Sequence, residues 1–120
     1  MTAAQIILIV NRNPRNAVLL SEFLERRGYL ARAVGSLEEL DHVLDSGDGY
    51  SLALIDVSGF NQEIWSRCSR LRAASVPFLL ISSPMHSVGT EQGLRHGATG
   101  VLTKPLAMSE LANLIDTLVL

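Results

Sequence analysis

The stretch Ser51-Leu52-Ala53-Leu54-Ile55-Asp56 contains an unbroken apolar run that ends on a carboxylate. Continuous apolarity over so short a run is typical of a strand that is buried on both faces of a parallel sheet. On either side of it, other short apolar runs alternate with longer amphipathic stretches, which is the pattern of β/α units. The sequence therefore predicts a doubly wound parallel sheet, with Asp56 at the carboxyl end of one of its buried strands.

Five strands and five helices are expected in strict alternation. The strands are expected at Gln5–Val10, Leu30–Val34, Ser51–Ile55, Val76–Ile81 and Gly100–Leu102. The helices are expected at Pro14–Arg27, from the cap Ser36 to about Ser46, at Asn61–Ala74, at Thr90–His96, and from the cap Ser109 to the C-terminus. Asn13 is a favourable N-cap before Pro14 at the first helical position. Ser36 and Glu39 have the spacing of a capping box, which supports the start of the second helix.

Composition limits the classes of function that the chain can have. Of its 120 residues, 48% are apolar and 18% are charged, and the formal net charge is −2. A chain of this length forms one domain, so we expect a single domain over residues 1–120. The balanced charge and the few aromatic residues argue against direct binding of nucleic acid. No signal-peptide pattern and no apolar run of about 18 residues is present, so a cytoplasmic protein with no membrane span is expected.

Polar side chains follow the expected strands where their carboxyl ends meet. In open parallel sheets, ligands bind in the crevice at this edge, near the point where the strand order reverses. The residues placed there are Asn11, Arg12, Asp56, Ser82, Ser83 and Lys104. This set contains one anion and two cations. No glycine-rich phosphate loop follows a strand, which disfavours a nucleotide-binding domain.

The order of these residues resembles the receiver domain of bacterial response regulators over essentially the whole chain. The features that carry the resemblance are Asp56, the stretch Pro77-Phe78-Leu79-Leu80-Ile81-Ser82, the pair Gly97-Ala98 and the stretch Leu102-Thr103-Lys104-Pro105. The most specific of them is the Lys-Pro dipeptide that lies 22 residues after Ser82. The resemblance implies an α/β, flavodoxin-like (βα)5 three-layer sandwich, whose parallel five-stranded sheet has the order 2-1-3-4-5. It also implies a cis peptide bond between Lys104 and Pro105.

The resemblance implies a role for each residue at the strand ends. In receiver domains, the position of Asp56 accepts a phosphoryl group from a histidine kinase. The Ser82 position hydrogen-bonds that phosphoryl group, and the Lys104 position forms an ion pair with it. Two acids at the end of the first strand hold Mg²⁺ in receiver domains, but this chain has Asn11 and Arg12 there. The metal pocket that the family uses is therefore degenerate.

The conformational switch of receiver domains is altered as well. In the family, an aromatic ring three residues before the lysine moves together with the hydroxyl residue of the fourth strand. This chain has Val101 at the aromatic position, and the stretch after Asp56 keeps almost none of the family pattern. Ser82 retains the hydroxyl group, but Val101 has no ring that rotates with it. We therefore expect the two-state element that phosphorylation biases to be missing.

Charge at the strand ends argues against metal binding. Asp56, Arg12 and Lys104 sum to one positive charge, and Mg²⁺ would raise the sum to three. At about 4 Å and an effective dielectric near 20, each pair of unit charges interacts by about 4 kcal/mol. We therefore expect Mg²⁺ binding to be weak or absent, no other cofactor, and a resting ion pair between Arg12 and Asp56. An aspartyl phosphate, in contrast, would be balanced by Arg12 and Lys104 without a metal.

The expected function is that of an atypical receiver, or pseudo-receiver, in two-component phosphorelay signalling. It would act as a protein-interaction module with no enzymatic activity and no need of phosphorylation. Its contact surface is expected on the fourth helix, fifth strand and fifth helix, from Thr90 to Leu120, for self-association or for a protein partner. The alternative is a functional phosphoacceptor, phosphorylated on Asp56 by a histidine kinase. A flavin-binding electron carrier on the same fold is disfavoured, because no Ser/Thr-rich phosphate loop follows the first strand.

Several residues remain open between a core and a contact role. Trp65 belongs either to the core or to a partner surface. The last helix has more apolar positions than one face needs, so its surplus either covers the sheet or binds a partner.

Cys68 is expected to be a small, half-buried hydrophobic residue rather than a redox site. The histidines are expected on the surface without metal-ligand spacing; they are His42, His86 and His96.

Overall fold

The computed structural model describes residues 5–47, 49–83 and 87–119. Its strands are β1 (Ile6–Val10), β2 (Leu30–Val34), β3 (Leu52–Asp56), β4 (Phe78–Ser82) and β5 (Gly100–Thr103). Its helices are α1 (Pro14–Arg26), α2 (Leu37–Asp45), α3 (Ile64–Ala73), α4 (Ser87–Arg95) and α5 (Met108–Val119). The strands form one parallel sheet of order β2-β1-β3-β4-β5. The predicted flavodoxin-like fold and its strand order are confirmed.

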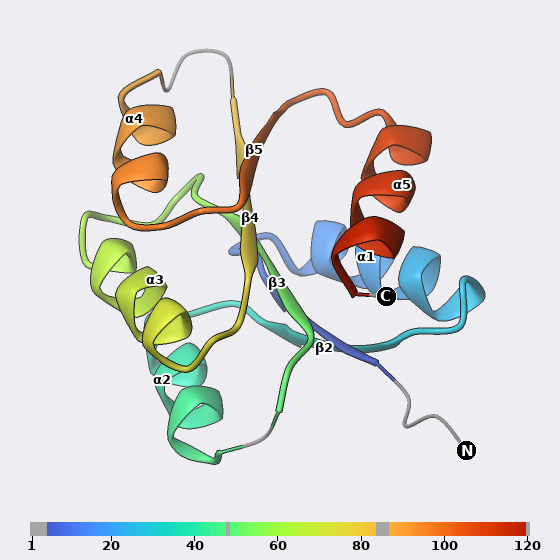
Figure 1. Ribbon diagram of the computed structural model, residues 1–120, viewed down its shortest axis with the longest axis horizontal. Coiled ribbons are helices and arrows are strands. Elements are labelled where there is room, and N and C mark those ends of the chain that lie inside the picture. Colours follow the sequence, from blue (N-terminus) through green and yellow to red (C-terminus); the bar gives the residue numbers. More distant parts are fainter. Residues whose placement is uncertain (1–4, 48, 84–86, 120) are drawn as a thin grey trace.

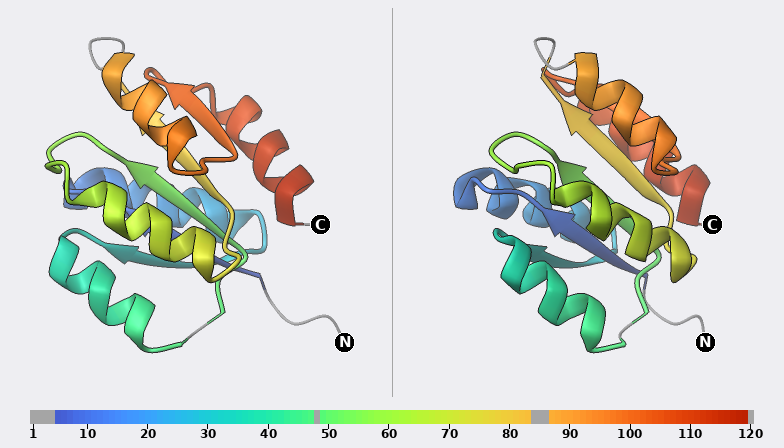
Figure 2. Two further views of the ribbon diagram at one scale, coloured as in Figure 1. Left: turned by 60° about the vertical axis from the view of Figure 1, so that its left-hand side comes forward. Right: turned by 90° about the vertical axis from the view of Figure 1, so that its left-hand side faces the viewer.

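The helices form two layers, one on each face of the sheet. Helices α1 and α5 cover one face, and α2, α3 and α4 cover the other (Figure 1). Figure 2 turns the second face forward and shows these three helices side by side across it. Among the described residues, no helix has the length and apolarity that a membrane span needs.

Three helices begin at other residues than the sequence predicts. Helix α5 begins at Met108, so Ser109 lies inside its first turn and is not the N-cap; the first helical bond runs from the Leu111 N–H to the carbonyl of Ala107. Helix α3 begins at Ile64 instead of Asn61. The Asn61 side chain accepts the backbone N–H of Glu63 at 2.8 Å, which forms a local turn that competes with the helix. Helix α4 begins at Ser87, before Thr90.

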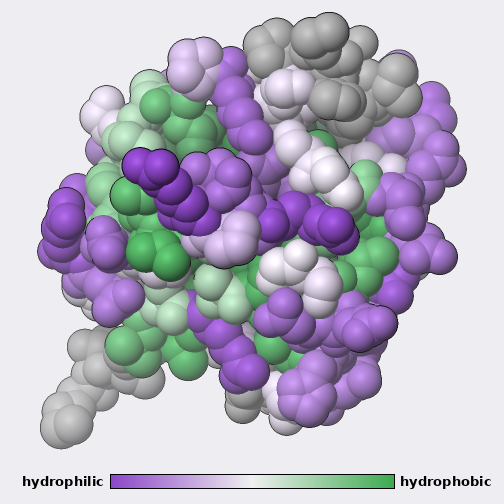
Figure 3. All heavy atoms as spheres, turned by 180° about the vertical axis from the view of Figure 1, so that it is seen from behind, coloured by the Kyte–Doolittle hydropathy of each residue, from purple (hydrophilic) through white to green (hydrophobic). Residues whose placement is uncertain are grey.

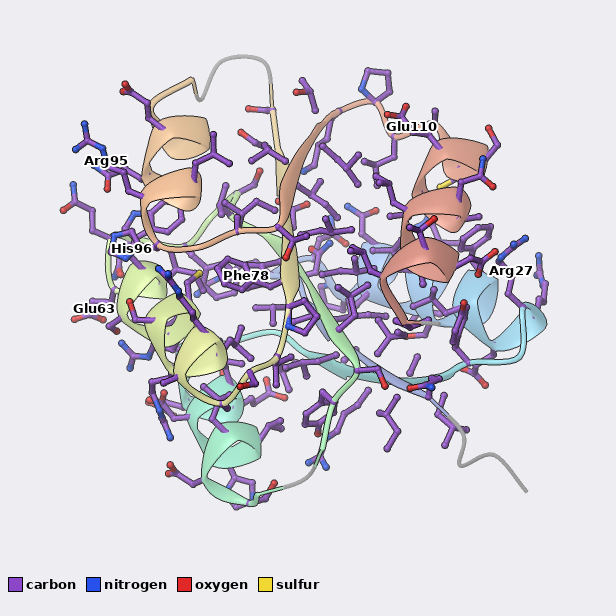
Figure 4. The ribbon with its side chains drawn as sticks, viewed as in Figure 1. Arg27, Glu63, Phe78, Arg95, His96 and Glu110 are labelled. Carbon is purple, nitrogen blue, oxygen red and sulfur yellow. The ribbon has the colours of Figure 1, made fainter. Side chains whose placement is uncertain are left out.

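Each face of the sheet has its own hydrophobic cluster. Successive side chains of β3 point to opposite faces of the sheet. Ala53 and Ile55 belong to the cluster under α2 and α3. Leu52 and Leu54 belong to the cluster under α1 and α5. Phe78 on β4 belongs to the first cluster, and Figure 4 shows its ring between the sheet and α3. Burying one such side chain contributes about 1.5–3 kcal/mol relative to leaving it exposed. The central strands β1, β3 and β4 are thereby fixed on both faces.

Most of the residues for which the sequence left a choice between a core and a contact role pack against the core. The surplus apolar side chains of α5 pack against the cluster under α1 and α5; they are Leu114, Leu118 and Val119. Trp65 packs against the other cluster, and its ring stacks on that of His96 at a centroid distance of 5.6 Å. Cys68 is fully buried, and burial raises the pKa of its thiol to about 12, so the thiol stays protonated.

The histidines differ in environment. His42 is exposed, as predicted. His96 is half-buried between α3 and the end of α4, where Figure 4 labels it, and its Nδ1 lies 3.3 Å from the Ser69 hydroxyl. His86 lies outside the described residues. The described residues contain no cluster of three or more His, Cys, Asp and Glu side chains with the spacing of a metal site.

Candidate functional site

The register of the sheet brings four polar residues to one edge. Val10 is paired with Ile55, Asp56 with Ile81, and Ser82 with Thr103. Asn11 directly follows Val10, and Lys104 directly follows Thr103, so their side chains start at the same edge as Asp56 and Ser82. The Lys104 backbone N–H donates to the Ser82 carbonyl at 2.9 Å, and the peptide bond to Pro105 is cis, as the resemblance implied.

Asp56 is a buried carboxylate whose oxygens are both occupied. Its side chain is 5% exposed, and Oδ2 lies 2.7 Å from the Lys104 Nζ. The amide Nδ2 of Asn11 approaches the same oxygen at 3.5 Å. Oδ1 accepts the backbone N–H of Ser58 at 2.9 Å. A buried charge is tolerated when it is paired and hydrogen-bonded in this way.

Lys104 is held by a second contact on the loop after β3. Its Nζ donates to the Ser58 hydroxyl at 3.3 Å, so Ser58 touches both members of the Asp56–Lys104 pair. The lysine side chain is 34% exposed, far more than its partner. Sequence reasoning did not identify Ser58. Its position two residues after an aspartate, where a side-chain carboxylate commonly accepts a backbone N–H, was the available signal.

Asn11 is committed to the turn that leads into α1. It is 5% exposed, and its Oδ1 accepts the backbone N–H of Asn13 at 2.9 Å. Asn13 in turn caps α1 by accepting the backbone N–H groups of Arg15 and Asn16 at 3.0 and 3.2 Å. The amide therefore presents its N–H₂ group, not its oxygen, to Asp56. The side chain at this position acts as a hydrogen-bond donor toward the carboxylate.

The structure contradicts the expected resting pair between Arg12 and Asp56. Arg12 is exposed, and no ion pair within the described ranges includes it. Its guanidinium carbon lies 5.7 Å from the centre of the Phe60 ring, within the range of a cation–π contact. Its aliphatic part runs along Gly59, where an added Cβ would lie 3.3 Å from the Arg12 Cγ. Lys104 already occupies the Asp56 oxygen from inside the site, which leaves the larger guanidinium outside.

Ser82 and Val101 lie close to this edge, but in different surroundings. Ser82 is buried at the end of β4, and its hydroxyl donates to the carbonyl of Ser83 at 3.2 Å. Val101 is half-buried on β5, paired with Leu80, and packs against the hydrophobic cluster under α2 and α3. Asn11 and Lys104 thus both contact Asp56, whereas Arg12 stands apart and Val101 packs against the core.

A hollow of about 660 Å³, which no pattern in the sequence predicts, opens beside the Asp56–Lys104 pair. It lies between α1 and the segment that joins β5 to α5, and it is lined mainly by apolar side chains. Its wall includes two apolar side chains that are exposed to solvent, Leu19 and Met108. Only the packing of α1 beside the start of α5 brings these residues together, because they are far apart in the chain.

Comparison with known proteins identifies the fold. No protein-family model matches the chain, and no curated protein matches it. A response regulator receiver protein from Pseudomonas putida is 21% identical, with a TM-score of 0.85 over 98% of this chain and 99% of that one. An orphan response regulator of H. pylori is 20% identical, with a TM-score of 0.82 over 100% of both chains.

The chain has the receiver-domain fold. A structure described as an adenylate cyclase from Rhodopirellula baltica matches as well, with 17% identity and a TM-score of 0.85 over 98% of this chain and 88% of that one. Identities at this level establish the receiver fold alone, because proteins of one fold carry out different functions. The function has to be argued from the residues at the strand ends.

Proposed function

We propose that this receiver-fold chain is an atypical receiver of two-component signalling, a protein-interaction module whose output does not require phosphorylation. The observation that carries the proposal is the buried Asp56–Lys104 ion pair at 2.7 Å, faced by the Asn11 amide where a phosphorylatable site would need metal ligands. The charge of the Asp56 carboxylate is compensated by Lys104, and both of its oxygens accept hydrogen bonds. Because phosphorylatable receiver domains also have a lysine at the Lys104 position, it is the amide in place of a metal-binding acid that gives Asp56 little tendency to accept a phosphoryl group.

The residues present do not fit Mg²⁺. This ion requires about six oxygen ligands in near-octahedral geometry and is held mainly by carboxylates and phosphates. Within the described part of the site, Asp56 is the one carboxylate, and Lys104 and Asn11 direct donors at its Oδ2. The Asn11 oxygen is engaged by the Asn13 N–H. A divalent cation would have to displace these contacts and approach a lysine at close range.

The switch position supports the same proposal. Val101 packs in the hydrophobic cluster and has no ring that exchanges between an inner and an outer position. Without such a bistable element, a charge added at Asp56 has no second packed state to favour. A constant contact surface is then the simplest output. We propose α4, β5 and α5 as this surface, for a protein partner or a second copy, and no enzymatic activity.

One observation favours a second function, a phosphoacceptor that a histidine kinase phosphorylates on Asp56. Arg12 is exposed and lies against Phe60, a few residues after Asp56 on the same loop. Rotation of its long side chain would bring a guanidinium to a phosphoryl group on Asp56, which Lys104 would also contact. Arginine binds phosphate through two parallel hydrogen bonds. This charge arrangement would need no metal.

Phosphorylation with a small-molecule phosphodonor separates the two functions. The intact protein is weighed after incubation with acetyl phosphate, with and without Mg²⁺, alongside Asp56→Asn. We expect no phosphoryl adduct on the unchanged protein in either condition. An adduct that forms without Mg²⁺ and is lost in both Asp56→Asn and Arg12→Gln would instead establish the metal-independent phosphoacceptor.

A double variant provides the positive control. Asn11→Asp combined with Arg12→Asp restores two carboxylates beside Asp56 and removes one cation. We expect this variant to bind Mg²⁺ and to accept a phosphoryl group only in its presence. If it binds Mg²⁺ no better than the unchanged protein, the charge argument against the metal is wrong.

A further inference from the structure

The hollow beside the Asp56–Lys104 pair has the size and the lining of a small-molecule site. Its volume of about 660 Å³ lies within the range of about 300–1,000 Å³ that is usual for ligand pockets. One of its ends reaches the polar residues of the strand edge, and its other end is walled by α1 and the segment before α5. The site is therefore apolar along most of its length and polar at one end.

The apolar wall includes side chains that remain open to solvent. Leu19 is 55% exposed and Met108 is 38% exposed, and both line the hollow together with Leu20, Ile81 and Leu106. Figure 3 shows green, apolar surface among polar residues on the side of the molecule where α1 and α5 lie. An apolar ligand body placed here would remove this surface from water, which is the main driving force for such binding.

The polar end is rich in hydrogen-bond donors. Two N–H groups of Lys104 point at Asp56 and Ser58, which leaves its third for a ligand. Asn16 in the first turn of α1 also lines the hollow; its backbone N–H donates to Asn13, whose own N–H donates to Asn11 at this end, and the helix dipole is positive there. The Asp56 oxygens are already occupied by Lys104, Asn11 and Ser58. This end therefore favours an acceptor group with a negative charge over a cation.

We propose that the hollow binds a small amphiphilic anion. Its acidic head group would lie against Lys104 and Asn16, and its apolar body would cover Leu19, Leu106 and Met108. Such a ligand would meet Lys104 from the solvent side and leave the ion pair with Asp56 intact. The inference goes beyond the proposed function and does not depend on whether Asp56 accepts a phosphoryl group.

Three probes with the same chain and different head groups test the charge preference. Decanoate, decanol and decylammonium are titrated into the protein at concentrations where each stays monomeric and dissolved. Binding is measured by calorimetry and by the NMR chemical shifts of the backbone and side-chain amides. We expect decanoate to bind about tenfold more tightly than decanol, and decylammonium to bind more weakly than both. Failure of decanoate to bind, or equal affinity for all three probes, would overturn the proposal.

Two leucines of nearly equal exposure, Leu19 and Leu94, serve to locate the site. Leu19 on α1 lines the hollow, while Leu94 on α4 is 57% exposed and does not line it. We expect Leu19→Gln to weaken decanoate binding about tenfold and Leu94→Gln to leave it unchanged. An equal loss in both variants, or none in Leu19→Gln, would show that the probe binds elsewhere.

A negative charge added at the polar end gives an independent readout. Asn16→Asp places a carboxylate in the first turn of α1, a favourable position for a negative charge in a helix. The side chain is exposed, so the variant is expected to fold. We expect the head-group order to invert, with decylammonium binding more tightly than decanoate. An unchanged order would mean that the head group does not lie at this end.

Discussion

Two carboxylate–cation contacts in this molecule have nearly the same length and different surroundings. Asp56 and Lys104 approach to 2.7 Å at the sheet edge, with the carboxylate 5% exposed. Asp41 and Arg67 approach to 2.8 Å between α2 and α3, with side chains that are 34% and 20% exposed. Distance alone does not rank them. Their surroundings decide how much each contributes and how each responds to mutation, salt and pH.

The Asp41–Arg67 contact is half-buried and belongs to a more exposed network that joins two helices, in which Arg70 and Asp45 are 42% and 69% exposed. Arg67 donates to both oxygens of Asp41, and Arg70 bridges Asp41 and Asp45 at 3.3 and 2.6 Å. Water and salt screen such groups, and each pair contributes little. The buried contact is different because, without Lys104, the charge of the buried Asp56 would keep only the hydrogen bonds from the Asn11 amide and the Ser58 backbone N–H. The comparison therefore predicts a sequence of effects from the buried pair down to the exposed network.

Removing the cation that pairs with the buried Asp56 should have the largest effect. Lys104→Met keeps the aliphatic stem and leaves the Asp56 carboxylate without its partner. We expect the free energy of unfolding to fall by about 3 kcal/mol, toward the lower end for a broken buried pair because the lysine is partly exposed. Urea denaturation at neutral pH measures this loss. The double variant Lys104→Met with Asp56→Asn should recover most of it, and a loss below about 1 kcal/mol would place the pair with ordinary surface contacts.

Adding a second carboxylate to the buried site should cause the second-largest loss of stability. Asn11→Asp is nearly isosteric and keeps an oxygen for the Asn13 N–H, but it replaces a donor by a like charge beside Asp56. We expect a loss of about 2 kcal/mol in the free energy of unfolding at neutral pH. Millimolar Mg²⁺ should restore part of this stability. Asn13→Asp is the matched control, since it adds the same charge at an exposed N-cap and should change the free energy of unfolding little.

Breaking the exposed network should cost less and should depend on salt. Asp41→Asn removes the contacts to Arg67 and Arg70, and we expect a loss of about 1 kcal/mol at low ionic strength. In about 1 M NaCl, where the Debye length falls to about 3 Å, the difference from the unchanged protein should shrink. The loss in Lys104→Met should persist under the same conditions. Equal salt dependence in both variants would break the distinction between the two contacts.

The smallest expected effect is the pH dependence of the exposed network. The hydrogen bonds from Arg67 hold the pKa of Asp41 below its usual value, with smaller contributions from the charges of Arg67 and Arg70. A carboxyl group with a lowered pKa in the folded state contributes stability above its unfolded pKa and loses it as the pH falls through the folded value. The difference between the unchanged protein and Asp41→Asn, measured by urea denaturation, should therefore be constant at neutral pH, begin to shrink near the unfolded pKa of about 4 and vanish only once the pH has fallen below the lowered pKa of the folded state. A difference that grows on acidification would contradict this assignment.

Much of the fold followed from local patterns. The apolar run Leu52–Ile55 predicted a strand buried on both faces, and Asn13 before Pro14 predicted the start of α1, both of which the structure confirms. The errors arose where two local signals compete. Asn61 forms a turn with Glu63 before α3 begins, and α5 begins before Ser109, so helix starts were less predictable than helix presence.

The candidate site was predictable in its members and unpredictable in its contacts. Because the carboxyl ends of parallel strands meet at one edge, the chain order alone placed Asn11, Asp56, Ser82 and Lys104 together. Charge counting could not tell which cation pairs with Asp56. The structure places Lys104 there and leaves Arg12 against Phe60, which depends on the shape of two loops rather than on charge.

The sequence by itself determined the alternation of strands and helices and the polar residues that end the strands, because both depend on periodicity and on neighbouring residues. The tertiary structure alone decided the partner of Asp56, the role of Ser58 and the presence of the hollow. Each of these depends on segments that are distant in the chain and adjacent only after packing, as Leu19 and Met108 are. Local rules carry no information on such distances, and the packed core provides it.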